Sequence, residues 1–174
     1  MGGIVTGVIP RPGHLRDVLE ASTELTVEEA ASAPLDGSPA TSGAAQILMD
    51  DLVVAVGDEQ PIPVHAAWHP IRLEAGPWVV QGDLPTLPGF DPGRALTRPT
   101  GTFVVLRDVR ISLLNQPDAG ENAHDTVLVN RYTVDRVDAD LMLGFFFPGA
   151  RIAAPVAVGL PVPLATVAEA PATA

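Results

Sequence analysis

Two of the four histidines in the chain, His65 and His69, stand four residues apart in the segment HAAWH. This spacing brings both side chains to one face of a helix or of a strand, where they could bind zinc. The segment lacks the glutamate of an H-E-x-x-H motif, and Pro70 would interrupt a helix. The pattern therefore favours two strand histidines, exposed or half-buried, and predicts no metal site.

A second group of metal-binding side-chain types lies in the segment DAGENAHD. Its oxygen donors are Asp118, Glu121, Asn122 and Asp125. Their spacing does not match a calcium-binding EF-hand, which needs acidic residues at positions 1, 3 and 5, a glycine at 6 and a glutamate at 12. The segment is therefore interpreted as a solvated loop.

Arginines cluster in the segment GRALTRPTGTFVVLRDVR, at Arg94, Arg98, Arg107 and Arg110. Guanidinium groups at this density can clamp a phosphate or a carboxylate. They can equally balance an acidic surface, and this second interpretation is favoured. The residues retained as weak ligand-binding candidates are Arg94, Arg98 and Arg131.

Polar pairs interrupt two apolar segments, as Asp50-Asp51 and as Asn130-Arg131. A buried polar group without a partner costs about 1–3 kcal/mol, so such pairs can mark a functional site. They can also hold two parts of a fold together by hydrogen bonds, with Arg131 paired to Asp50 or Asp51. The structural interpretation is favoured here.

Composition excludes several classes of function. The chain contains no cysteine and no lysine, which excludes thiolate catalysis, a Schiff-base lysine and a Walker-type phosphate lysine. None of its serines lies in a G-x-S-x-G element, and glycine-rich nucleotide-binding patterns are absent. The net charge of −11 argues against nucleic acid and anionic membranes as partners. We therefore expect no catalytic residues, no cofactor and no enzymatic activity.

The strands and turns that must position these residues are predicted from a segment that occurs twice in the sequence. GIVTGVIPRPGHLRDVL (Gly3 to Leu19) matches WVVQGDLPTLPGFDPGRAL (Trp78 to Leu96), with Gly7 against Gly82. LTVEEA then matches VVLRDV, and ILMDDLVVAV matches VLVNRYTVDRV, in the same order. This order predicts an internal duplication in which each copy reads strand, turn, short helical turn, strand, loop, strand.

Most of the remaining segments are rich in β-branched residues and bounded by glycine, proline or aspartate, as strands are. HLRDVLEA has apolar residues at helical spacing, which predicts one or two helical turns. TVEE (Thr26 to Glu29) fits either a helix-capping box or, by the repeat, a strand, so Thr26 to Ala33 is left open between helix and strand. Ser32 to Gly43 and Asn115 to Asp125 are expected to be loops.

The segment LMLGFFFPGA holds three consecutive phenylalanines, which cannot all face one core from a single strand. The proline-interrupted apolar segment APVAVGLPVPLA follows it. Such an arm could join a partner protein or a second subunit, or it could wrap over its own fold. The candidate interface residues are Phe145, Phe146, Phe147 and Leu164.

The blocks GPWVVQGDLPTLPGFDPGRAL, FVVLRDVRI and VLVNRYTVDRV carry a G-x-L-x-x-x-P-G-x-D-P element and a V-N-R-x-x-V-D element. Over roughly Pro61 to Val137 the sequence resembles uncharacterised conserved proteins of actinobacteria. The resemblance implies no activity, and it agrees with a cytoplasmic setting. The motifs of the cyclic-dinucleotide-binding PilZ domain are not met, because Arg11 and Arg16 are one residue too far apart.

Together these patterns predict a mostly-β, acidic, cytoplasmic protein, a small β-barrel or sandwich built from two pseudo-symmetric repeats with short helical turns. Residues 1–60 form the first repeat, 61–140 the second, and 141–174 the apolar C-terminal arm with a frayed end. No apolar run reaches the roughly 18 residues that span a membrane. The predicted function is non-catalytic protein–protein contact, as a scaffold, adaptor or regulatory partner, with a protein partner or self-association through the arm. The alternative is a small-ligand-binding β-barrel that recognises an anionic metabolite or nucleotide.

Overall fold

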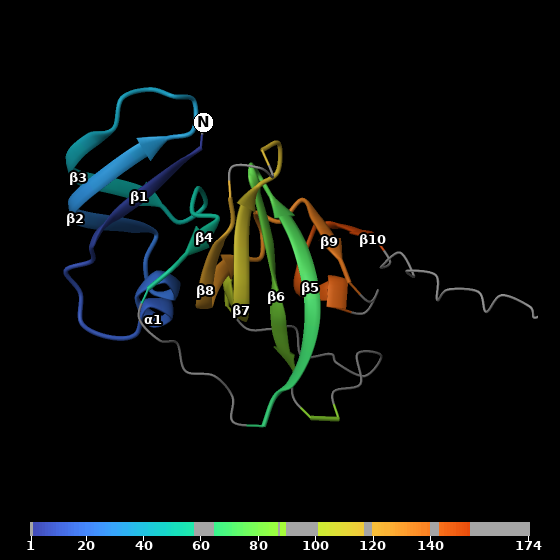
Figure 1. Cartoon of the computed structure of the whole chain (residues 1–174). Helices are drawn as coiled ribbons and strands as arrows, with labels where there is room; N and C mark the ends of the chain where they lie inside the picture. The colour runs from blue at the N-terminus through green and yellow to red at the C-terminus, as the bar shows by residue number, and fades with distance from the viewer. Residues whose placement is uncertain are drawn as a thin grey trace, which may run out of the picture.

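The structure is a computed structural model, and it describes residues 2–57, 65–86, 88–89, 101–116, 120–139 and 143–153. Strands dominate this part of the chain, which confirms the mostly-β prediction. They form two sheets, a three-stranded one in the order β1-β2-β3 and a seven-stranded one in the order β10-β9-β5-β6-β7-β8-β4. Figure 1 shows the first sheet to one side of the second, with the helix α1 beneath it.

The first sheet and α1 come from residues 2–57. Their bounds are β1 (Gly3–Val8), α1 (Leu15–Glu20), β2 (Glu24–Pro34) and β3 (Thr41–Leu48). The sheet is antiparallel throughout. In β2, Leu25 and Val27 are buried while Thr26 and Glu28 are exposed, which is the alternation of a half-buried strand.

Three features of this region differ from, or resolve, the sequence-based expectations. Thr26 to Ala33 lie entirely in β2, so TVEE is strand and not a helix start. The helical turns expected in HLRDVLEA are confirmed as α1, which buries Val18 and Leu19. The expected loop from Ser32 to Gly43 is wrong at both ends, because β2 runs to Pro34 and β3 begins at Thr41. Backbone pairing between the two strands overrides the weak strand propensity of this Ala- and Ser-rich segment.

The second sheet takes one short strand from the N-terminal part and the rest from residues 65–153. Its members are β4 (Val54–Ala55), β5 (Ala67–Ala75), β6 (Trp78–Thr86), β7 (Phe103–Leu113), β8 (Asn122–Asn130), β9 (Arg136–Asp138) and β10 (Arg151–Ala153). β10 pairs with β9 in parallel, and the other pairings are antiparallel. β8 begins at Asn122, so the loop expected from Asn115 to Asp125 ends earlier than predicted.

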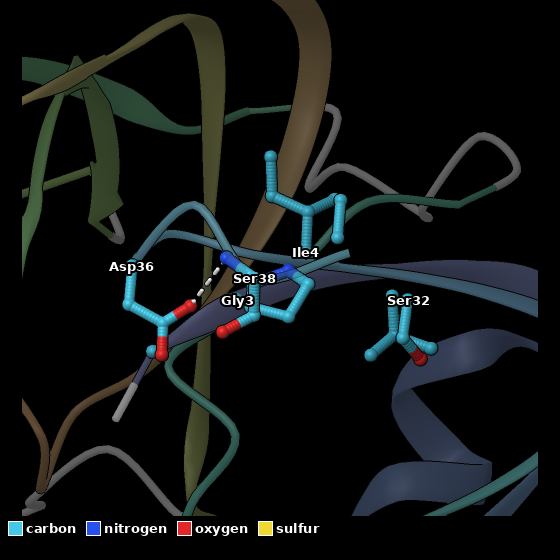
Figure 2. A pocket seen from close by; sticks show the side chains of 9 residues that line it. Gly3, Ile4, Ser32, Asp36 and Ser38 are labelled. Carbon is cyan, nitrogen blue, oxygen red and sulfur yellow. Dashed lines mark hydrogen bonds between the residues drawn. The ribbon is translucent and has the colours of Figure 1, made fainter. Parts of the chain in front are cut away.

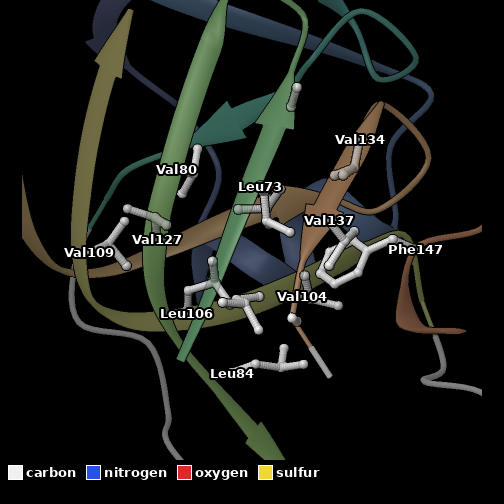
Figure 3. Packing of buried hydrophobic residues seen from close by; sticks show 14 of the residues in the cluster. Leu73, Val80, Leu84, Val104, Leu106, Val109, Val127, Val134, Val137 and Phe147 are labelled. Carbon is white, nitrogen blue, oxygen red and sulfur yellow. The ribbon is translucent and has the colours of Figure 1, made fainter. Parts of the chain in front are cut away.

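The second sheet curls around the larger of two apolar cores. Figure 3 shows side chains from β5 to β9 converging inside this curl, with Phe147 closing one side. Phe147 and Leu143 come from the segment around the 3-10 turn η2 (Leu143–Phe146) and are 2% and 5% exposed. The sheet ends in β10 and β4, which are not neighbours, so it is curled without closing into a barrel.

The smaller core is shared between the N-terminal and C-terminal parts of the chain. Leu19, Leu25 and Val27 pack there with Phe103 and Leu128. β7 and β8 therefore bury side chains on both faces, since Val104 and Val127 belong to the larger core. Strands covered on both faces read as continuous apolar runs, as FVVL and VLV do.

The triplets β1-β2-β3 and β6-β7-β8 share a β-bulge at matching positions. In the first, Thr6 pairs with Ala31 and Val8 with Glu28, which leaves an extra residue in β2. In the second, Gln81 pairs with Arg110 and Asp83 with Arg107, which leaves an extra residue in β7. The only non-glycine residues with positive φ in the described chain are the two at these bulges, Glu29 (φ 49°) and Asp108 (φ 51°).

A glycine faces each bulge across the strand pair because there is no room for a side chain. A Cβ at Gly7 would lie 2.6 Å from the carbonyl oxygen of Glu28, and one at Gly82 would lie 2.9 Å from that of Arg107. Both contacts are with backbone, which cannot move aside as a flexible side chain can.

We expect Gly7→Ala and Gly82→Ala each to lower the free energy of unfolding by about 1–3 kcal/mol, because each forces the bulged strand away. Urea unfolding followed by circular dichroism measures this. The control is Thr6→Ala, an exposed position beside Gly7, which should change stability by no more than about 0.5 kcal/mol. Equal stability of the glycine variants and this control would contradict the close approach.

Candidate interaction surface

Exposed apolar side chains concentrate on the first sheet. The described residues include eight exposed large hydrophobic side chains, and four of them are Ile4, Val5, Val8 and Leu48. Their exposed fractions are 44%, 37%, 54% and 55%. Scattered single residues of this kind are normal on a surface, but a group on one small sheet marks a contact site.

No strand among the described residues pairs with the outer side of β1, and all six residues of β1 are exposed. The corresponding strand of the other triplet, β6, is paired on that side with β5. Edge strands of monomeric proteins are usually protected by charges, prolines or short length. The sequence of β1, GIVTGV, contains neither a charge nor a proline.

The charge of the first sheet is entirely acidic. β1 and β3 carry no ionisable side chain, and β2 carries Glu24, Glu28 and Glu29, all exposed. Any partner of this sheet must therefore be neutral or basic where it approaches β2, and it meets no charge along β1.

A shallow hollow of about 370 Å³ lies where β1 meets the end of β2. Figure 2 shows Gly3, Ile4 and Ser32 on its walls, with Asp36 and Ser38 from the following turn. The amide of Ser38 donates a 2.9 Å hydrogen bond to Oδ1 of Asp36. Hydrogen bonds from Ser38, first from its side chain and then from its backbone, lower the pKa of Asp36.

The three consecutive phenylalanines have three different environments. Phe145 is 67% exposed, Phe146 is half-buried, and Phe147 is 2% exposed in the larger core. They lie in and after the turn η2, which turns each side chain in a different direction. Phe145 therefore remains an interface candidate, whereas Phe147 is a core residue and is not available to a partner. Leu164 lies outside the described residues.

The outer face of the second sheet carries cations that are paired with carboxylates. Arg72 Nη1 lies 2.6 Å from Glu74 Oε1 and 2.9 Å from Asp138 Oδ2, and Arg136 Nε lies 2.8 Å from Asp138 Oδ1. The hydrogen bond that Arg72 donates to Glu74 is the main cause that raises the pKa of Arg72, with the bond to Asp138 adding to it. The pair between Arg72 and Asp138 joins β5 to β9, and the other two pairs lie within β5 and within β9.

Arg107, from the predicted arginine cluster, is engaged in a similar way. Its guanidinium lies 3.7 Å from the centre of the Trp68 ring, and its nitrogens lie 3.5 Å from Asp83 and 3.3 Å from Asp108. This region borders a polar hollow of about 510 Å³ that His124 also lines. Arg110 is exposed on β7. Arg94 and Arg98 lie outside the described residues, so the predicted cluster is only partly placed.

The polar pairs Asp50-Asp51 and Asn130-Arg131 do not share one environment. Asp50 and Asp51 are exposed in the turn after β3, so they are not buried polar residues. Asn130 is 2% exposed and joins this turn to β8: its Nδ2 donates to the carbonyl of Met49 (3.1 Å), and its backbone amide donates to that of Val53 (2.9 Å). Asn130 thus hydrogen-bonds across the two parts of the chain.

Arg131 is also buried, at 2% exposure. Its Nη1 donates to the carbonyl of Gly101 at 3.4 Å, and its guanidinium lies 5.4 Å from the centre of the Tyr132 ring. A ligand in solvent therefore has little access to this cation. Sequence reasoning selected Arg131 for its type and position, but burial depends on tertiary packing that one sequence does not reveal.

Of His65 and His69, only His69 lies on a strand, as the sequence analysis favoured for both, because His65 lies in a turn ahead of β5. His65 is exposed ahead of β5, and His69 is half-buried on β5 with Nε2 2.9 Å from the Thr86 hydroxyl. Among the described residues no group of three or more histidine, aspartate or glutamate side chains is arranged to hold a metal ion. In the same part of the chain, no helix is long and apolar enough to cross a membrane.

Sequence reasoning missed the β1 edge. The signal was present, since GIVTGV is an uncharged β-branched segment, but the sequence alone did not show which strand lacks a neighbour. Comparisons with family models, curated proteins and solved structures found no match to this chain. The assignment of a function therefore rests on the geometry above.

We expect Asn130→Asp to lower the free energy of unfolding by about 2–4 kcal/mol, because a buried carboxylate would replace the amide that donates to Met49. Chemical denaturation at pH 7 measures the change. Asn122→Asp is the matched control, because the same substitution falls on an exposed residue of the same strand. Similar losses in both variants would show that the hydrogen bond to Met49 is unimportant.

Asp36 should titrate below the 3.8 of an unperturbed aspartate when it is followed by NMR. Because its pKa is lower in the folded chain, the turn is stabilised above the unfolded pKa, and this contribution is lost as the pH falls through the folded pKa. Ser38→Ala should raise the pKa only part of the way, since the backbone hydrogen bond remains. A pKa at or above 3.8 in the unsubstituted protein would contradict the Ser38 contacts.

Proposed function

We propose that this chain is a non-catalytic protein that acts through protein–protein contacts, as a scaffold, adaptor or regulatory partner. The observation that carries the proposal is the first sheet, which has an open, uncharged β1 edge and a concentration of exposed Ile, Val and Leu side chains. Full burial of one such side chain is worth about 1.5–3 kcal/mol, so a partner that covers several of them gains substantial affinity.

Phe145 is proposed as a second contact point. Its ring is 67% exposed, and the neighbouring residues Leu143 and Phe147 anchor its backbone in the larger core. An aromatic ring held on a fixed turn loses little conformational entropy on binding, which is typical of interface anchors. The extension of this interface to Phe146 and to the arm as far as Leu164 stays a prediction.

The alternative proposal, an anionic small ligand, has less support. Arg131 is buried, Arg107 is engaged with Trp68 and with carboxylates, and Arg94 and Arg98 lie outside the described residues. A thermal-shift screen with nucleotides and anionic metabolites distinguishes the two, because a ligand at 100 times its dissociation constant stabilises the fold by about 2.7 kcal/mol.

We further infer that the chain is an internal duplication, with two halves packed as a sandwich-like pair. Support comes from the shared order β1-β2-β3 and β6-β7-β8, the matching bulges at Glu29 and Asp108, and the matching glycines Gly7 and Gly82. The shared smaller core gives the two halves one packing interface. The resemblance to uncharacterised actinobacterial proteins and the cytoplasmic setting stay predictions.

The experiment is an affinity capture from a lysate of the native host with full-length protein as bait. Ile4→Ser combined with Val8→Ser tests the first sheet, Phe145→Ser tests the second contact point, and Val56→Ser is a control that is equally exposed elsewhere, at 48%. Substitutions are preferred to a truncation at Asp140, which would remove Leu143 and Phe147 from the core.

We expect partners captured by the unsubstituted bait to be lost with the first-sheet variant or with Phe145→Ser, and retained with Val56→Ser. The reason is that the first two remove apolar contact area from the proposed surfaces. Mass spectrometry with label-free quantification measures the loss. Identical capture by all baits, or no specific capture by any, would contradict the proposed function.

A further inference from the structure

We propose that β1 is a self-association strand, whose outer edge pairs antiparallel with β1 of a second copy of this chain. This rests on the proposed function and names the partner of its main surface. The result is one continuous sheet across the two copies in the order β3-β2-β1-β1-β2-β3. Five observations lead to this arrangement.

The first is the comparison of two similar edges within the chain. β6 and β1 occupy corresponding positions in their triplets, next to the bulged strands β7 and β2. The chain covers the outer edge of β6 with the antiparallel strand β5, over nine residue pairs. It offers no described strand to the outer edge of β1. The fold thus shows what kind of element such an edge accepts, namely an antiparallel strand.

The second is the direction of the backbone groups of β1. Leu35 N donates to Gly2 O at 3.0 Å, and Gly3 to Thr6 pair in regular register with Pro34 to Ala31. In an antiparallel pair, alternate residues direct both backbone groups toward the partner strand. Ile4 and Thr6 therefore bond to β2, and Gly3 and Val5, which precede the register shift between Thr6 and Val8, direct their N–H and C=O groups outward.

The third is the symmetry that these outward groups allow. A twofold axis between two antiparallel copies of one strand must place some residue opposite itself. With Val5 at the centre, Val5 faces Val5, Gly3 faces Gly7, and Ile4 faces Thr6 of the second copy. The outward N–H and C=O groups of Val5 then pair with those of Val5 in the second copy, and those of Gly3 lie beside Gly7. The edge of β1 is self-complementary in this register.

The fourth is the absence of a charge barrier at the seam. The ionisable residue on β2 nearest this strand is Glu28, which pairs with Val8. In the proposed register, Glu28 of the two copies would be three strand spacings apart across the sheet and about six residues apart along it. With ~4.8 Å between strands and ~3.4 Å per residue, this separation is about 25 Å, well beyond the ~8 Å Debye length at physiological ionic strength.

The fifth distinguishes β1 from the other open edge, β3. Ala45 and Ile47 of β3 are half-buried against the smaller core, and Gly43 has a φ of 146° beside the bulge. β1 instead combines full exposure with the β-branched residues Ile4, Val5, Thr6 and Val8, which favour strand pairing. A six-residue strand is a small contact, so we expect a dissociation constant in the micromolar range or weaker.

The first test is the mass of the purified full chain by sedimentation equilibrium, from micromolar to millimolar concentration. We expect a reversible shift from 18.1 kDa toward twice that mass. Val5→Pro should abolish the shift while leaving the fold intact, because the N–H of Val5 points outward and makes no bond to β2. A chain that stays monomeric throughout overturns the proposal, as does a dimer that Val5→Pro leaves unchanged.

The second test fixes the register and does not depend on the proline variant. The chain has no cysteine, so an introduced one can form a disulfide only between copies. Val5→Cys should cross-link with itself under mild oxidation. Ile4→Cys and Thr6→Cys should cross-link when mixed but not singly, because in this register like residues lie ~8 Å apart, beyond disulfide reach.

Leu48→Cys is the control for these cross-links, since Leu48 lies on the β3 edge and is 55% exposed, more than the 37% of Val5. Cross-linking of Leu48→Cys as fast as that of Val5→Cys would overturn the β1 assignment. Efficient self-cross-linking of Ile4→Cys would overturn the register. A monomer whose lysate partners are lost with the Ile4→Ser and Val8→Ser substitutions would end this inference and leave the proposed function standing.

Discussion

The arrangement of the whole chain depends on the smaller core, which neither part of the chain can form alone. Leu25 and Val27 of β2, with Leu19 of α1, are buried against Phe103 and Leu128 of the second sheet. The carboxylate of Glu20, at the end of α1, accepts two further hydrogen bonds of 2.8 Å from the backbone amides of Thr102 and Phe103. The first sheet is thus attached near the start of β2, and its far end, from Ala31 to Ala44, has no core to cover.

The first sheet contacts the smaller core near the start of β2, and this explains why the triplets β1-β2-β3 and β6-β7-β8 have different neighbouring strands. β6-β7-β8 lies within a seven-stranded sheet, with β5 on one edge and β4 on the other. Along the chain, β4 follows the first triplet and β9 follows the second. β4 pairs with the outer edge of β8, whereas β9 pairs with β5. No described strand therefore covers the outer edge of β3. The chain therefore satisfies the second triplet internally and leaves backbone groups of the first triplet open. This asymmetry supports the proposal that a partner binds at the first sheet.

The sequence predicts many of the individual strands and turns but not which strands lie beside one another. Gly7 and Gly82, with the apolar segments that follow them, predicted the matching triplets because close approach and burial restrict those residue types. The strand residues Thr41 to Gly43 were missed because the surrounding Ser, Gly and Ala residues have little strand propensity, and pairing with β2 makes this segment a strand. Contacts between residues distant in sequence determine three further features. These are the open edge of β1, the burial of Arg131, and the burial of Phe147 beside an exposed Phe145. The sequence identified the polar pairs Asp50-Asp51 and Asn130-Arg131 but not which of them is buried. That difference depends on the turn after β3, where the Met49 carbonyl accepts a hydrogen bond from Asn130.

The charge of the chain gives the uncharged strand its selectivity. A net charge of −11 opposes encounters between two copies, because molecules of like charge repel each other. β1 is six residues without charge at an edge where the nearest carboxylates would stay far apart in the symmetric register. Repulsion elsewhere then acts against other orientations, in the way that like charges suppress wrong partners at natural interfaces. The same repulsion weakens the pairing at low ionic strength, so β1 self-association should strengthen as salt screens the remaining charge.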